Sequence, residues 1–85
     1  MRLTKSVIQQ LLEQNEGFEL TTHYSAKNLT ESRNYSISSG ELHIRSTGKT
    51  PWADSRFDVT WVADEEETRR FLRNDLNLLN TDGLD

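Results

Sequence analysis

Hydrophobic and polar residues alternate most regularly between Arg33 and Ser46, where the chain reads RNYSISSGELHIRS. With Ser39 and Gly40 as a two-residue hairpin turn, apolar residues lie opposite apolar residues and polar residues opposite polar ones. The predicted cross-strand pairs are Ser38 with Glu41, Ile37 with Leu42, Ser36 with His43, Tyr35 with Ile44 and Arg33 with Ser46. Because a shift of one residue would destroy this match, the pattern predicts a hairpin of fixed register with one apolar face.

Two more segments alternate and are predicted to be half-buried strands. In the segment 18–24 one face carries Phe18, Leu20, Thr22 and Tyr24, and in the segment 56–62 the inward face carries Phe57, Val59 and Trp61. The polar segments Ser25–Ser32 (SAKNLTES) and Thr47–Ser55 (TGKTPWADS) are predicted to be loops between strands. These connections are too short for helical crossovers, so we expect every strand to be antiparallel to its neighbour.

Helical periodicity occurs near both ends of the chain. A first helix, capped by Thr4 or Ser6, is predicted to run to about Asn15, and Gly17 supplies the left-handed residue that commonly follows a helix. The apolar side of this helix comprises Leu3, Val7, Ile8, Leu11 and Leu12.

A second helix is predicted from Asp64, whose spacing to Glu67 is that of a capping box, to about Leu79. Its sheet-facing residues are expected to be Phe71, Leu72, Leu76, Leu78 and Leu79. The same helical wheel places Asp75 among them. Since an unpaired buried carboxylate is costly, we expect Asp75 to lie at the rim of the core or to accept a hydrogen bond.

These elements together predict an α+β fold in the order αββββα. We expect a four-stranded antiparallel sheet with both helices on one face and water on the other. Residues 1–80 are expected to form a single α+β domain, and residues 81–85 a flexible C-terminal tail.

The composition narrows the class of protein. The chain has 85 residues, of which 33% are hydrophobic and 28% charged, and its formal net charge is −4. This charge disfavours nucleic-acid binding over the whole surface but leaves room for a local basic patch. The absence of cysteine excludes disulfides and thiolate metal sites. No apolar run reaches the ~20 residues of a membrane span, so we expect a cytoplasmic protein of a bacterium or phage.

Catalytic and cofactor sites find little support in the sequence. The triplet 48–50 (GKT) lacks the earlier glycine of a phosphate-binding loop, because that position is His43, and it is interpreted as a turn between strands. His23 and His43 lie on separate strands without metal-ligand spacing. A trio of Ser36, His43 and Asp58 would lie on a flat face without a pocket. We therefore expect no enzyme activity, no cofactor and no metal.

Basic residues and a tryptophan gather at one end of the predicted hairpin; they are Arg33, Arg45, Lys49, Trp52 and Arg56. Three interpretations stay open. Trp52 folds back onto the core while the charges keep the loop soluble, or the cluster anchors a protein partner, or the indole stacks on a base. Because the chain is acidic and no pocket is expected, we favour a small non-catalytic protein-interaction module of unknown partner, monomeric or weakly homodimeric, that uses the open sheet face or an edge strand. Nucleic-acid binding through the same cluster is the alternative.

The opening of the chain, Ser6–Glu13 (SVIQQLLE) followed by Gly17–Leu20 (GFEL), resembles the start of a double-stranded RNA-binding domain. The resemblance implies an amphipathic helix, an antiparallel sheet and a second helix, in that order. The chain departs from the family where that second helix begins, because the family has phosphate-binding lysines there and this chain has Asp64–Glu67. The family's sheet also has three strands, whereas four are predicted here. The resemblance therefore supports the fold, and duplex RNA binding by that mode is not expected.

Overall fold

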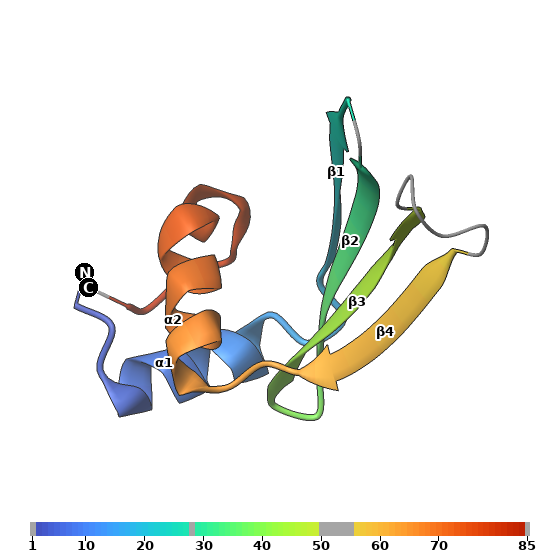
Figure 1. The fold of residues 1–85 in the computed structure, drawn as a ribbon. Coiled ribbons are helices and arrows are strands. Elements are labelled where there is room, and N and C mark those ends of the chain that lie inside the picture. The colour runs from blue at the N-terminus through green and yellow to red at the C-terminus, as the bar shows by residue number, and fades with distance from the viewer. Residues whose placement is uncertain (1, 28, 50–55, 85) are drawn as a thin grey trace.

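The computed structural model describes residues 2–27, 29–49 and 56–84, which form two α-helices and a four-stranded antiparallel sheet (Figure 1). In chain order the elements are α1 (Lys5–Gln14), β1 (Glu19–Ala26), β2 (Leu29–Ser38), β3 (Glu41–Lys49), β4 (Phe57–Val62), α2 (Glu65–Asn74) and the 3-10 turn η1 (Leu76–Leu78). The strands lie side by side in the order β1-β2-β3-β4, each antiparallel to the next. The predicted α+β fold and element order are confirmed.

The turn between β2 and β3 has the predicted position. Ser39 and Gly40 have φ angles of 55° and 71°, and positive φ at both central residues is the requirement of the tight turn that matches sheet twist. The carboxylate of Glu16, which follows α1, accepts a 2.8 Å hydrogen bond from the Ser39 N–H. This contact stabilises the turn. Every predicted cross-strand pair of this hairpin, from Ser38 with Glu41 to Arg33 with Ser46, is present.

The helix N-termini follow the predicted capping pattern. The hydroxyl of Thr4 accepts a hydrogen bond from the N–H of Val7 at the start of α1. At the start of α2 the N–H of Glu67 donates to the Asp64 carboxylate over 2.8 Å, while the Glu67 carboxylate accepts from the Asp64 N–H over 3.4 Å. This reciprocal pair is the predicted capping box. Gly17, with φ 86°, then turns the chain from α1 into β1.

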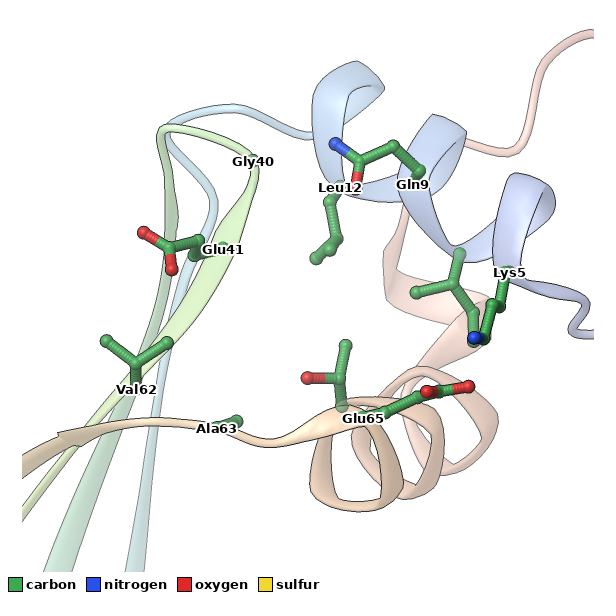
Figure 2. A pocket seen from close by; sticks show the side chains of 10 residues that line it. Lys5, Gln9, Leu12, Gly40, Glu41, Val62, Ala63 and Glu65 are labelled. Atoms are coloured by element: carbon green, nitrogen blue, oxygen red, sulfur yellow. The ribbon is translucent and has the colours of Figure 1, made fainter.

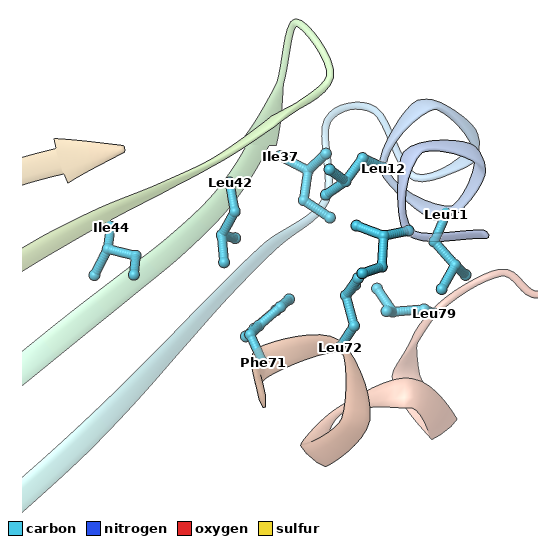
Figure 3. Close-up of a cluster of buried hydrophobic side chains, with 9 residues drawn as sticks. Leu11, Leu12, Ile37, Leu42, Ile44, Phe71, Leu72 and Leu79 are labelled. Atoms are coloured by element: carbon cyan, nitrogen blue, oxygen red, sulfur yellow. The ribbon is translucent and has the colours of Figure 1, made fainter. Parts of the chain in front are cut away.

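Both helices pack on one face of the sheet, which we call the inner face (Figure 3). The buried hydrophobic residues are Ile8, Leu11 and Leu12 of α1, Ile37, Leu42 and Ile44 of the sheet, and Phe71, Leu72 and Leu79. The ring of Phe71 stacks on Tyr35 with centroids 4.9 Å apart and meets Phe18 edge-on at 6.2 Å. This cluster fixes the helices against the hairpin end of the sheet.

The second helix is shorter than predicted. It ends at Asn74, and Asp75, with φ −116°, has left the helical conformation. Asn and Asp side chains compete with the helical backbone for hydrogen bonds, which explains an end at this pair. The 3-10 turn that follows keeps Leu79 buried but leaves Leu78 53% exposed, so the prediction that Leu78 faces the sheet is wrong. Asp75 is half-buried at the rim of the core, which is the first of the two positions that we expected for it.

The strands are longer than predicted. The pairing of β1 with β2 continues to Ala26 and Leu29, and that of β2 with β3 continues to Thr30 and Lys49. The predicted loop Ser25–Ser32 and the loop start at 47–49 are therefore wrong. Gly48 lies within β3, opposite both β2 and β4, and is not part of a turn. These segments are polar because no helix covers them, and the polarity imitates that of a loop. Residues 50–55 of the second predicted loop lie outside the described residues.

Asn15 joins the C-terminal segment to the end of α1. Its side-chain amide donates to the carbonyl oxygens of Leu11 at 2.9 Å and Asn80 at 3.0 Å, and its side-chain oxygen accepts from the Asn80 N–H at 2.8 Å. The side chain of Gln14 also donates to the Asn80 carbonyl at 2.9 Å. Asn15 is buried, whereas Gln14 is only half-buried. Both side chains thus link the C-terminal segment to the end of α1, since Gln14 also donates to the Asp82 carbonyl at 3.0 Å, and Asn15 is the buried one of the two. Flexibility beyond residue 80 stays a prediction.

We expect Asn15→Ala to lower the free energy of unfolding by about 1–3 kcal/mol, because it removes three side-chain hydrogen bonds of a buried residue, including the one that the Asn80 N–H donates to it. Urea denaturation followed by circular dichroism measures this change. Gln14→Ala is the matched control and should cost less than half as much, because Gln14 is more exposed. Equal costs for the two variants would contradict the role assigned to Asn15.

Candidate functional site

The sheet extends well beyond the helices (Figure 1). The molecule measures 48 Å along its longest axis and 22 and 20 Å across it. A helix of 10 residues spans about 15 Å, whereas a strand of 10 residues spans about 33 Å, so α1 and α2 are too short to cover β2. Within residues 2–27, 29–49 and 56–84, neither helix therefore covers the far half of the inner face, and we call this bare half the distal inner face. The register assigns to it Thr22, Tyr24, Glu31, Arg33, Ser46, Gly48, Phe57 and Val59.

Large apolar side chains lie exposed on this face. Tyr24 is 58% and Val59 51% exposed, and Phe57 is half-buried. The ring of Phe57 lies over Gly48, since a Cβ atom at Gly48 would approach the ring Cζ to 2.7 Å and the carbonyl oxygen of Thr30 to 2.1 Å. Glycine is therefore required at position 48 so that the aromatic ring can lie against the backbone of β3. A sheet surface of this kind has apolar area available for a partner.

An ion pair lies in the middle of the distal inner face. The carboxylate of Glu31 accepts hydrogen bonds from the Arg33 guanidinium and, at 3.0 Å, from the hydroxyl of buried Ser46. The Arg33 guanidinium also lies 5.9 Å from the ring centroid of Trp61, whose indole N–H donates to Glu67 at 3.1 Å. These contacts connect the bare half of the sheet to the start of α2. The Arg33 guanidinium, with help from the Ser46 hydroxyl, holds the pKa of Glu31 below its ordinary value.

The structure separates the predicted basic cluster. Arg33 lies on the inner face, whereas Arg45 lies on the opposite, open face and pairs with Asp58 of β4 through hydrogen bonds of 3.0 and 2.7 Å. Arg45 holds the pKa of Asp58 below its ordinary value. Each arginine is thus paired with a nearby carboxylate, Arg33 with Glu31 and Arg45 with Asp58. Lys49 and Arg56 line a hollow of about 170 Å³ at the far end of the sheet, together with Glu31. Trp52 lies outside the described residues.

Sequence reasoning missed Tyr24, Phe57 and Val59 as site residues. Alternation correctly assigned all of them to the inner face, and from that we expected burial. A difference in length between the helices and the strands is the signal that could reveal the bare half. The sequence predicts strands that are too short, so this difference is not visible in the prediction.

The open face is polar except for Val62 at the end of β4, which is 49% exposed. A trough of about 450 Å³ is lined by Glu19, Thr21, Ser32, Asn34, Arg45 and Thr47. Beside it the ring Nδ1 of His23 lies 2.9 Å from the Ser32 hydroxyl, and the Asn34 amide donates to Thr21 at 3.0 Å. His23 is exposed to water, so the described residues form no enclosed space for a substrate next to this serine. The trough offers polar contacts and carries no nucleophile shielded from solvent.

The suggested catalytic trio is not assembled. Ser36 lies opposite His43, but the His43 ring contacts the carbonyl oxygen of Ser38 at 3.3 Å, and Asp58 is engaged by Arg45. His23 and His43 lie two strands apart at different levels of the sheet, since the register sets His23 level with Thr47. Over residues 2–27, 29–49 and 56–84 no three histidine, aspartate or glutamate side chains converge in the manner of a metal site.

Another concave surface lies where the two helices meet the ends of β3 and β4 (Figure 2). This groove has a volume of about 360 Å³. Aliphatic side chains of Ile8, Leu12 and Val62 line it, and Lys5 and Glu65 lie on its rim. Its volume is at the lower end of the range of small-molecule sites, and the described residues that line it include no aromatic residue and no arginine.

Comparison with known proteins gives no further guide. No protein-family model matches the chain, and neither the curated proteins nor the solved structures contain a match. None of the helices in the described part of the chain is long and apolar enough to cross a membrane. The function is therefore inferred from the geometry of the surfaces.

We expect Glu31→Gln to lower the free energy of unfolding at pH 7 by about 0.5–1 kcal/mol, because it removes the ion pair with Arg33. The folded-state pKa of Glu31 lies below its unfolded value, so this stabilisation is complete above the ordinary carboxyl pKa of about 4.3 and is lost as the pH falls through the folded-state pKa. The difference between the wild type and the variant should therefore shrink on acidification. Urea titrations followed by tryptophan fluorescence, at pH 7 and at a pH below the folded-state pKa of Glu31, measure this difference.

Glu66→Gln is the matched control for this prediction. Glu66 pairs with Arg70 at 3.3 Å, but the side chains are 81% and 67% exposed, and such pairs contribute almost nothing. A difference for Glu31→Gln that stays constant down to acidic pH would contradict the assigned ion pair.

Proposed function

We propose that this domain is a non-catalytic protein-interaction module whose binding surface is the distal inner face. The observation that supports this function is an uncovered sheet surface on which Tyr24 and Val59 are more than half exposed beside Phe57 and Arg33. Tyrosine, tryptophan and arginine dominate the binding energy of protein interfaces because they combine large apolar area with directed hydrogen bonds. A flat, mixed surface of this type fits another protein better than a small molecule, which needs a concave site.

Charge favours a protein over a nucleic acid as the partner. Arg33 and Arg45 point to opposite faces and each contacts a carboxylate, so they do not form one basic patch for a phosphate backbone. A formal net charge of −4 adds long-range repulsion. Lys49 and Arg56, which line the same hollow, are the remaining described part of the predicted basic cluster. They could add rim contacts to a protein interface, where charges mainly raise the association rate.

The distal inner face is a better candidate than the groove between the helices. The groove is lined by aliphatic residues such as Ile8 and Leu12, which are themselves buried and belong to the core. The distal inner face contributes nothing to that core, so its exposed apolar side chains need another explanation. Binding a partner explains them, since burial of apolar area contributes roughly 25 cal/mol per Å².

We expect Val59→Ser to reduce capture of the partner at least tenfold, a loss of about 1.4 kcal/mol of binding energy. The tagged domain is incubated with host lysate, and captured proteins are quantified by mass spectrometry. The matched control is Thr60→Ser, which changes the next residue of β4 on the open face. Circular dichroism and urea denaturation verify that both variants stay folded. Equal capture by the two variants would contradict the proposed surface.

Trp52→Ala belongs in the same experiment, because the sequence predicts this residue as an anchor. If it loses the same captured proteins as Val59→Ser, the segment 50–55 takes part in the interface. If it captures normally while Val59→Ser does not, the distal inner face suffices without it.

A further inference from the structure

We propose that β1 is a self-pairing edge, at which the β1 strand of a second copy adds antiparallel and joins two four-stranded sheets into one of eight strands. This inference concerns the purified chain alone. It goes beyond the proposed function and does not depend on the identity of any other partner.

The β1 edge is unprotected. All eight residues of β1 pair with β2 in continuous register, without a bulge. From Leu20 to Ala26 the strand contains no lysine, arginine, aspartate, glutamate, proline or glycine, and residues 21–26 are all exposed. Soluble proteins normally block such an edge with charges, proline, bulges or short length. The other edge, β4, is shorter, with six residues, and carries the charged Asp58.

The hydrogen bonds of the sheet identify the free backbone groups. The Ile37 N–H donates to the carbonyl oxygen of Phe18, and the Ile37 carbonyl accepts from Gly17. Odd-numbered residues of β2 therefore point their backbone groups at β1, and in the register these pair with Leu20, Thr22 and Tyr24. The backbone groups that face outward from β1 are those of Glu19, Thr21, His23 and Ser25. These are the groups that an added strand would pair with.

Only registers that set an outward-facing residue opposite another outward-facing residue can form hydrogen bonds. A two-fold axis at Thr22 meets this rule and pairs residues 19–25 of both copies. Leu20 then lies opposite Tyr24 of the second copy, and this apolar pair occurs twice. An axis at His23 would set two histidines opposite each other, and an axis at Thr21 would pair a shorter part of the strand. The axis at Thr22 is therefore the favoured register.

Charges also agree with this register. Glu19 is the acidic residue of β1 and lies opposite Ser25 of the second copy. The diagonal neighbours on the same face are His23 and Lys27 of the second copy, and diagonal positions are within reach of long side chains. No two like charges lie opposite each other. The edges are thus complementary to themselves in hydrogen bonding and charge.

Antiparallel pairing also gives the bare half of the sheet a neighbour. The axis at Thr22 sets the distal half of each sheet beside the helix-covered half of the other, with both inner faces on the same side. Tyr24, which is 58% exposed, then meets Leu20 of the second copy, a residue packed against that copy's core. Part of the exposed apolar surface is thereby covered. A single strand pair buries less area than the roughly 1,200–2,000 Å² of a standard interface, so we expect a weak, reversible dimer.

Cysteine cross-linking tests the register directly, because the chain contains no cysteine. Thr22 lies opposite itself at a position without backbone hydrogen bonds, where Cα atoms are about 4.5 Å apart, within the range that a disulfide spans. We expect Thr22→Cys to form dimers under mild oxidation at least tenfold faster than Thr21→Cys, His23→Cys or Thr60→Cys on the β4 edge. Faster cross-linking of Thr21→Cys or His23→Cys would overturn the register, and equal rates for all four would overturn the self-pairing edge.

Charge substitution tests the same contact without a covalent bond. In sedimentation equilibrium the wild type should dimerise reversibly, and Thr22→Lys and Thr22→Glu should each weaken the dimer at least tenfold, because like charges face each other at the axis. An equimolar mixture of the two variants should recover the dimer as a heterodimer. Circular dichroism verifies folding, since residue 22 is exposed. A wild type that stays monomeric up to ~1 mM overturns this proposal and leaves the Val59→Ser capture result unaffected.

Discussion

The register of the β2–β3 hairpin is the constraint on which the rest of the structure depends. Ser39 and Gly40 adopt positive φ angles, and the Glu16 carboxylate holds the Ser39 N–H. A slip of one residue would turn Ile37 and Leu42 to the open face and leave the helices without a core. It would also separate Glu31 from Ser46 and Arg33 from Trp61, since each of these contacts joins residues that the same register brings together. One turn therefore determines the core and the candidate site.

A mismatch of length then divides the sheet into two halves. The half beside the turn is covered by two short helices and is stabilised by buried apolar area. The distal half has no helix above it in the described part of the chain, and its contacts are of another kind: the ion pair of Glu31 with Arg33, the buried hydroxyl of Ser46, and the ring of Phe57 over Gly48. Because these contacts leave large apolar side chains in water, the distal half is more suited to binding than to holding the fold together.

What the sequence predicted well was local. The hairpin turn, both helix N-caps and the apolar sides of the helices as far as Leu72 depend on residues within a few positions of each other, and they are confirmed. What it predicted poorly depended on distant parts of the chain. Polar strand ends such as Ser25–Ala26 and Thr47–Lys49 imitate loops because no helix reaches them, and Leu78 faces water because the helix ends at Asn74. For the same reason alternation assigned Tyr24 and Val59 to the correct face but overestimated their burial.

The two surfaces proposed here follow from a single cause. Strands that extend past their helices expose an inner face, and they also expose the edge of β1, which the fold leaves without a gatekeeping charge from Leu20 to Ala26. Such an edge is an aggregation hazard unless something pairs with it. Closed two-fold pairing removes the hazard, because each β1 strand can accept only one other strand and the remaining β4 edges carry Asp58. It also places two distal inner faces on the same side of one sheet, so that a partner with two epitopes would bind with increased avidity.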